Sequence, residues 1–116
     1  MKITEIAQLV DGEIVGAPAD DVYEANMFTD VTGAYASDLL SDVMGNARAG
    51  QIWITMQTHK NVSAIASLKD LPAVILVHGA VPDIDMLEHA REEDVCILVS
   101  KDMTYQVCGK LYALLG

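Results

Sequence analysis

The chain has few basic residues, and this scarcity excludes one broad class of partner. Lys and Arg together number 7 in 116 residues, against 17 Asp and Glu, so the formal net charge is −10. A chain with this balance repels the phosphate backbone of DNA or RNA, and we expect no nucleic-acid partner. A small anionic ligand stays compatible with it, because helix N-termini hold an anion locally through backbone N–H groups.

Long apolar runs and cysteine motifs are also missing. Apolar runs such as Ala73–Val77 are far shorter than the ~20 residues that a bilayer span requires. Glu5 and Gln8 stand where a signal peptide would need apolar residues, so we expect a cytoplasmic protein with no membrane partner. Cys96 and Cys108 form neither a CxxC pair nor a zinc-ligand pattern, which favours buried thiols and predicts no metal or other cofactor.

Catalytic motifs are absent as well. The sequence contains no GxxxxGK[ST] phosphate loop, no HExxH, no nucleophile elbow and no recognisable Ser/His/Asp arrangement. Asp30, Asp38 and Asp42 could form an acidic metal patch, although two Asp four residues apart on a helix more often form a solvated face. The sequence therefore favours a protein that is not an enzyme.

Aliphatic side chains, in contrast, are abundant in the chain. Hydrophobic residues make up 52% of it and aromatic residues only 5%, and Val and Ile occur in short runs. Runs of this kind are typical of strands that are buried on both faces, as in an α/β sheet. At this length we expect a single domain over residues 1–116.

The hydrophobic periodicity predicts an alternation of helices and strands. We expect a first helix capped by Thr4, a short strand at Glu13–Val15, and a strand over residues 27–36 that breaks near Gly33. The later elements are a helix of about ten residues capped by Ser37, a strand over 51–56, a helix capped by Asn61, a strand over 73–77, a helix opened by Pro82 and Asp83, a strand over 95–100 and a helix over 103–115. Repeated strand–helix–strand units predict a three-layer α/β/α fold with a mostly parallel sheet.

In parallel sheets, ligands bind at the carboxyl ends of the strands. This rule selects residues 55–61, 77–82 and 100–104, and we add the loop around Thr32–Gly33. The candidate ligand-binding residues within these loops are polar or glycine: Thr55, Gln57, Thr58, His59, Lys60, Asn61, His78 and Gly79. One interpretation is a pair of histidines sharing a ligand, or His59 and Lys60 contacting a phosphate beside a helix N-terminus. The other is an ordinary polar turn.

Two further residues carry expectations that the structure can test. His89 lies among Glu88, Glu92 and Glu93, which indicates a surface position. Trp53 lies between Ile52 and Ile54 in a predicted strand, which indicates the core or a subunit interface.

The region from about Phe28 to Gly79, and more loosely the whole chain, resembles a DRTGG domain. That family has a strand ending in a Gly-Asp-Arg turn, and a following strand ending in Thr-Gly-Gly. Gln57–His59 and Val77–Gly79 occupy these two places, and of the five signature letters only Gly79 is present. The segments Asp38–Met44, Trp53–His59 and Gly109–Gly116 are similar to the free-standing branch of the family.

The resemblance implies the α/β/α fold of the N-terminal domain of HPr kinase/phosphorylase and, more remotely, of Mur ligase N-domains. It also implies a regulatory or assembly role, because DRTGG domains accompany CBS domains in some pyrophosphatases without being the catalytic part. Free-standing members are often labelled serine kinase-like, but that activity requires a phosphate loop in a further domain, which these residues do not contain. Free-standing members also tend to be encoded near iron-only hydrogenase and related redox subunits in anaerobes, so the resemblance implies a redox-enzyme partner.

Two functions follow as expectations. The first is a non-catalytic regulatory module, expected as a homodimer, that binds a small anionic or nucleotide-like ligand at the strand-end edge. The alternative is a protein-interaction or assembly subunit of a larger redox enzyme, with no small ligand; apolar content, Trp53 and several methionines motivate it.

Overall fold

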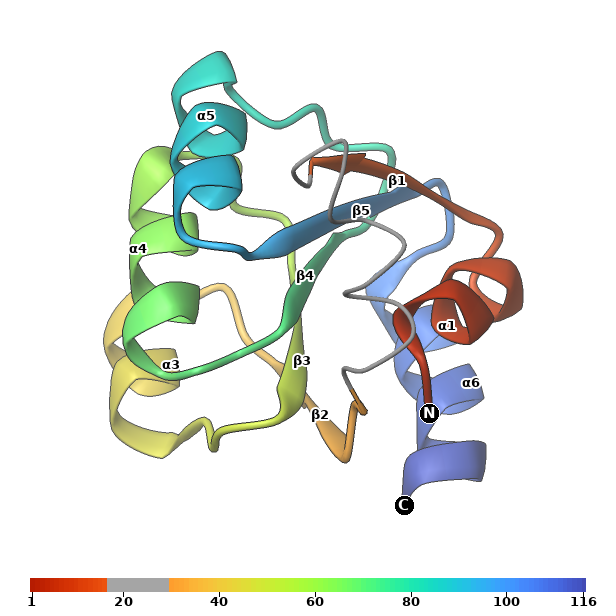
Figure 1. The fold of residues 1–116 in the computed structure, drawn as a ribbon. Coiled ribbons are helices and arrows are strands. Elements are labelled where there is room, and N and C mark those ends of the chain that lie inside the picture. The colour runs from red at the N-terminus through yellow and green to blue at the C-terminus, as the bar shows by residue number, and fades with distance from the viewer. Residues whose placement is uncertain (17–29) are drawn as a thin grey trace.

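A computed structural model describes residues 1–16 and 30–116, and Figure 1 shows a sheet with helices on both faces. No helix in these two ranges combines the length and the apolar character needed to cross a bilayer. The predicted α/β fold with three layers is confirmed. The strands are β1 (Gly12–Gly16), β2 (Gly33–Ala36), β3 (Gln51–Thr55), β4 (Ala73–Leu76) and β5 (Cys96–Ser100). The helices are α1 (Ile3–Leu9), α3 (Leu40–Asn46), α4 (Lys60–Leu68), α5 (Ile84–Glu92) and α6 (Thr104–Leu115).

The strands lie side by side in the order β1-β5-β4-β3-β2. Strands β2 to β5 are parallel, and β1 is antiparallel to β5 at one edge. The sheet is therefore mostly parallel, as predicted. Because the carboxyl ends of β2 to β5 meet at one edge, the loops that leave these strands are brought together there.

Each face of the sheet contributes to a separate hydrophobic core. Helices α1 and α6 pack on one face, and α3, α4 and α5 pack on the other (Figure 1). Ile75 of β4 belongs to the first core and Leu76 to the second, and neither side chain is exposed. Burial on both faces explains why this strand is a continuous apolar run.

Three predicted N-caps are wrong by two positions. A helix begins where the backbone changes from extended to helical. A residue type that often caps helices need not lie at that point of the chain. The Ser37 hydroxyl accepts the backbone N–H of Leu39 at 3.1 Å, so it stabilises a turn before α3, which has 7 residues instead of about ten. The observed N-caps are Lys2 in place of Thr4, Leu39 in place of Ser37, and His59 in place of Asn61.

The loop around Thr32–Gly33 does not lie at the predicted edge. β2 begins at Gly33, where a break was expected, so this loop enters the strand at its amino end. Ser37 and Asp38 follow β2 and therefore occupy the carboxyl edge. Residues 27–29 of the predicted strand lie outside the described residues.

The two cysteines are free thiols. Cys96 is buried in β5, and burial raises its pKa to about 12. Cys108 is half-buried on α6, and burial raises its pKa as well. The prediction of a buried thiol is therefore confirmed for Cys96, while Cys108 is only partly covered.

Candidate functional site

The turn after β3 is tied to the end of β2 by Asp38. The buried Thr55 donates its hydroxyl hydrogen to Asp38 Oδ1 at 2.7 Å, and the backbone N–H of Met56 donates to the same oxygen at 2.7 Å. Gln57 donates its amide Nε2 hydrogen to the Asp38 carbonyl oxygen at 3.2 Å. Thr55 and Gln57 thus hold the shape of the turn.

Asp38 was not among the candidate site residues. The sequence pattern grouped it with Asp42 on a helix face, whereas Asp42 accepts a hydrogen bond from the Tyr35 hydroxyl at 2.9 Å. Asp30 instead pairs with the N-terminal amino group of Met1. The three carboxylates of the hypothetical metal patch therefore have three different partners. Among the described residues, no three His, Cys, Asp or Glu side chains lie together in a way that could hold a metal ion.

The next segment of this turn forms the start of α4. His59 is the N-cap, and its Nδ1 lies 2.8 Å from Asp83 Oδ2, while the Asp83 backbone N–H donates to the Thr58 carbonyl at 2.9 Å. The His59 and Asp83 side chains are 67% and 50% exposed, so solvent screens this pair and it contributes little to stability. Lys60 and Asn61 follow on the exposed first turn of α4.

The turn after β4 is tied to the start of α6. The backbone N–H of Thr104 donates to His78 Nε2 at 3.1 Å, and Thr104 Oγ1 lies 3.0 Å from the same nitrogen. Nε2 therefore acts as an acceptor, and His78 serves as a cap for α6. His78 and Gly79 both have positive φ, 62° and 68°, and their N–H groups donate to the carbonyls of Asp102 and Ser100 at 2.9 Å.

The two candidate histidines consequently have separate partners. His59 contacts the loop before α5, and His78 contacts α6. His89, expected at the surface, is half-buried, with its Nδ1 3.0 Å from Ser63 Oγ. Because that hydroxyl already donates to the Lys60 carbonyl at 2.8 Å, His89 Nδ1 is the donor, and it joins α5 to α4.

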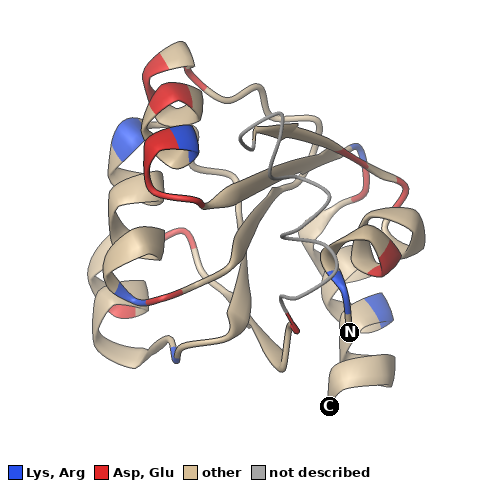
Figure 2. Ribbon diagram, in the orientation of Figure 1, with Lys and Arg blue, Asp and Glu red and all other residues tan. Residues whose placement is uncertain are grey.

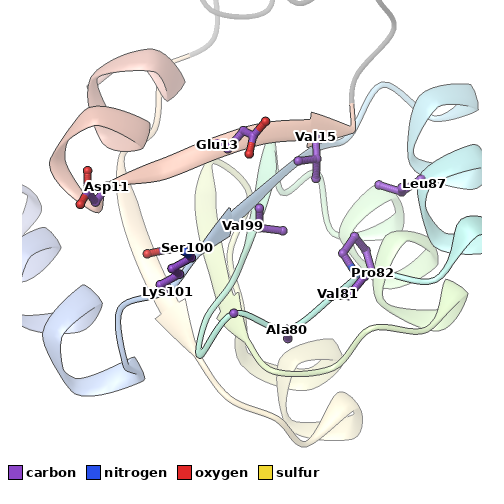
Figure 3. A pocket seen from close by; sticks show the side chains of 11 residues that line it. Asp11, Glu13, Val15, Ala80, Val81, Pro82, Leu87, Val99, Ser100 and Lys101 are labelled. Carbon is purple, nitrogen blue, oxygen red and sulfur yellow. The ribbon is translucent and has the colours of Figure 1, made fainter.

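A pocket of about 580 Å³ lies at the same edge, but beside β5 rather than β3 (Figure 3). Of the predicted site residues, only Gly79 lines it. The loops 77–82 and 100–104 were predicted from the sequence, and parts of both contribute to the pocket. The contribution of β1 was missed, because no local pattern shows that β1 pairs with β5. The lining residues are Asp11, Glu13, Val15, Gly79, Ala80, Val81, Pro82, Leu87, Val99, Ser100 and Lys101.

Charge is distributed unevenly around this framework (Figure 2). Acidic residues gather on α5, which carries Asp85, Glu88 and Glu92. Neither α4 nor α6 contains an Asp or a Glu. The first turns of α4 and α6 at the carboxyl edge thus contain no acidic residue, although Asp83 lies against the N-cap His59 of α4.

The described residues form an α/β/α sandwich. The polar turns that follow its parallel strands lie at one edge of the sheet, and the pocket lies at the same edge. No protein-family model matches the chain, and no curated protein matches it. Among solved structures, it is similar to the CBS and DRTGG domains of the regulatory region of Clostridium perfringens pyrophosphatase, in complex with the activator diadenosine tetraphosphate. The TM-score is 0.68 at 11% identity, over 95% of this chain and 47% of that chain. At this identity the likeness establishes the fold, which is DRTGG/CBS-like, and the chain spans about half the length of that structure.

Proposed function

We propose that the protein is a non-catalytic regulatory module that senses a small anionic or nucleotide-like ligand at the carboxyl edge of β3 and β4. The similar solved structure supports this, since it is a regulatory region and was determined with a nucleotide activator. The proposed contacts come from the two adjoining turns, with Thr55 and Gln57 as positioning residues. The residues are Thr55, Gln57, Thr58, His59, Lys60, Asn61, His78 and Gly79.

The N-terminus of α4 is the observation that carries this proposal. Its N-cap makes no side-chain cap hydrogen bond, as in α3 and α5, and its first turn contains no acidic residue, as in α6 but unlike α1, α3 and α5. No hydrogen bond among the described residues uses the backbone N–H of Lys60 or Asn61. These donors, the positive end of the helix dipole and the Lys60 ammonium together suit a phosphate or carboxylate group.

Replacing Lys60 by alanine should weaken binding of a nucleotide or phosphorylated metabolite about tenfold, since a hydrogen bond to a charged group contributes about 1.5–3 kcal/mol. We would measure binding by calorimetry after screening a nucleotide and phosphometabolite panel by thermal shift. Lys69→Ala is the matched control, because Lys69 is the C-cap at the other end of the same helix. His59→Ala and Thr58→Ala should also reduce the ligand-induced thermal shift.

Equal affinities for the wild type, Lys60→Ala and Lys69→Ala would place the ligand elsewhere. An absence of any stabilising ligand in the panel would count against the sensing function itself. Salt should weaken the interaction, because screening reduces the attraction between the anion and Lys60.

A second candidate function is assembly, and one observation favours it: an exposed apolar side chain follows each of the parallel strands. The side chains are Leu39 after β2, Met56 after β3, Val81 and Ile84 after β4, and Met103 after β5. A partner covering this edge would remove them from water. We propose a second copy of the chain as that partner, with a redox enzyme as the alternative. Trp53 plays no part at such a surface, because its side chain is 0% exposed.

Substitution of Val81 by lysine should abolish a homodimer that light scattering detects at micromolar concentration. Leu68→Lys is the control, because Leu68 is 69% exposed, close to the 78% of Val81, but lies at the far end of α4. A wild-type protein that stays monomeric up to millimolar concentration would contradict the homodimer. Loss of the dimer with both variants would move the interface away from the carboxyl edge.

A further inference from the structure

The pocket beside β5 is an open one, lined by four segments that are far apart in the sequence. β1 and the residue just before it supply Asp11, Glu13 and Val15, and the turn after β4 supplies Gly79 to Pro82. The end of β5 supplies Val99 to Lys101, and α5 supplies Leu87. Its volume of about 580 Å³ is within the range of small-molecule sites in proteins. This pocket is separate from the first turn of α4, and its chemistry differs.

The pocket exists because β1 is covered unequally on its two faces. Ile14 packs against the core formed with α1 and α6, so by alternation Glu13 faces the other side of the sheet. Val15 lies at a register shift between Ile14 and Gly16, and it lines the pocket as well. Glu13 lies opposite Val99 in the antiparallel register. On this side α5 packs against the Gly16 end of β1, where Leu87 Cδ2 would lie 2.7 Å from a Cβ added to Gly16. The portion from Asp11 to Val15 is left to form the pocket wall.

The pocket has a charged end and an apolar end. Figure 3 shows Asp11 and Lys101 at one end, Glu13 midway along β1, and Val15 and Leu87 at the other end. Among the described residues, no ion pair or hydrogen bond uses the side chain of Asp11, Glu13 or Lys101. The Ser100 hydroxyl already donates to the Val10 carbonyl at 2.6 Å. Recognition of a polar group therefore depends mainly on the three charged side chains.

We infer that this pocket binds a small zwitterion with a primary ammonium group and an apolar tail, of the apolar amino-acid type. The ammonium is attracted by Asp11 and Glu13, the carboxylate by Lys101, and the tail packs against Val15 and Leu87. Two carboxylates against one ammonium disfavour a phosphorylated ligand here. The inference thus goes beyond the anion site proposed on α4 and names a second ligand, a zwitterion recognised mainly through its ammonium group.

Three probes of similar shape separate the contributions of the charges. L-leucine carries both charged groups, 3-methylbutylamine lacks the carboxylate, and 4-methylpentanoate lacks the amine. We expect L-leucine to bind best, the amine to bind more weakly, and the carboxylate not to bind. Methyl signals of Val15, Val99 and Leu87 should shift in NMR spectra of the full chain, since these side chains line the pocket.

Glu13→Gln should weaken L-leucine binding about tenfold, because it removes a charge while it keeps the side-chain shape. Glu92→Gln on the exposed face of α5 is the matched control and should leave the affinity unchanged. Lys101→Ala should weaken L-leucine but leave 3-methylbutylamine unaffected. Glu13→Gln should not alter phosphate or nucleotide binding at α4. Each of the two proposals can therefore be contradicted without contradicting the other.

Several results would overturn the inference. One is an absence of methyl shifts with all three probes at millimolar concentration. Another is equal binding of 4-methylpentanoate and L-leucine, which would remove the role of the two carboxylates. A third is an unchanged L-leucine affinity in Glu13→Gln.

Discussion

Replacement of Trp53 by alanine is expected to lower the free energy of unfolding by about 3–5 kcal/mol. The indole is 0% exposed and lies in the core between the sheet and α3, α4 and α5. In the register, Trp53 is paired with Tyr35 on one side and Val74 on the other, so the cavity would open in the middle of the sheet. Urea or thermal denaturation followed by far-UV circular dichroism would measure the loss.

The Trp53 ring also has a polar contact that can be tested separately. Its Nε1–H donates to the Ser37 carbonyl at 2.8 Å, and Ser37 precedes Asp38, which holds the turn after β3. Trp53→Phe keeps most of the ring and removes this donor, so a loss of about 1–3 kcal/mol is expected. A loss below about 1 kcal/mol for Trp53→Ala would show that the indole is not in the core. Equal losses for both variants would mean that the hydrogen bond outweighs the burial.

The strands in the middle of the sheet were predictable, because a strand that is buried on both faces has a continuous run of apolar residues. β3, β4 and β5 coincide with short Val- and Ile-rich runs, and the helices between them follow from apolar spacing. The parallel arrangement then follows from the lengths of the crossovers. The predicted first residues of the helices were less accurate, because a helix begins where the packing of the whole element requires it. Asn61 is a good capping residue by type, but the extended backbone that precedes α4 is at His59.

The candidate site was predictable in place but not in its contacts. The rule for parallel sheets selected the exits of β3, β4 and β5, and these do meet at one edge. Which side chains face one another depends on residues distant in the sequence: Asp38 is 17 positions from Thr55, and Asp83 is 24 from His59. No local pattern contains such pairings. The placement of β1 beside β5, which creates the pocket, is a property of the strand order alone.

The polar exit after β3 is consequently two different surfaces. Its first part, Thr55 to Gln57, is used internally to join β3 to the end of β2. Its second part, His59 to Asn61, is exposed at the start of α4. A ligand acting there would change the charge balance at His59 and Asp83, which connects α4 to the loop before α5. Under the proposed sensing function, this exposed pair is the contact that links the N-cap of α4 to that of α5.

Single truncations on β4 test whether both faces of the sheet support the fold. Ile75→Ala and Leu76→Ala should each lower the free energy of unfolding by about 2–5 kcal/mol, because each removes a fully buried side chain and leaves a cavity. The two positions are adjacent but belong to separate cores, so their losses come from opposite sides of the sheet. Chemical denaturation of each variant would measure them.

Tyr105→Ala is the control for these variants, because Tyr105 is 89% exposed and its removal should change stability by no more than about 0.5 kcal/mol. A large loss for Leu76→Ala with none for Ile75→Ala would mean that α1 and α6 do not cover their face in solution. The reverse result would point to weak packing of α3, α4 and α5. Because the strand-end turns are held between β-strands and helices from both layers, either result would also undermine the geometry that the proposed ligand binding at the carboxyl edge requires.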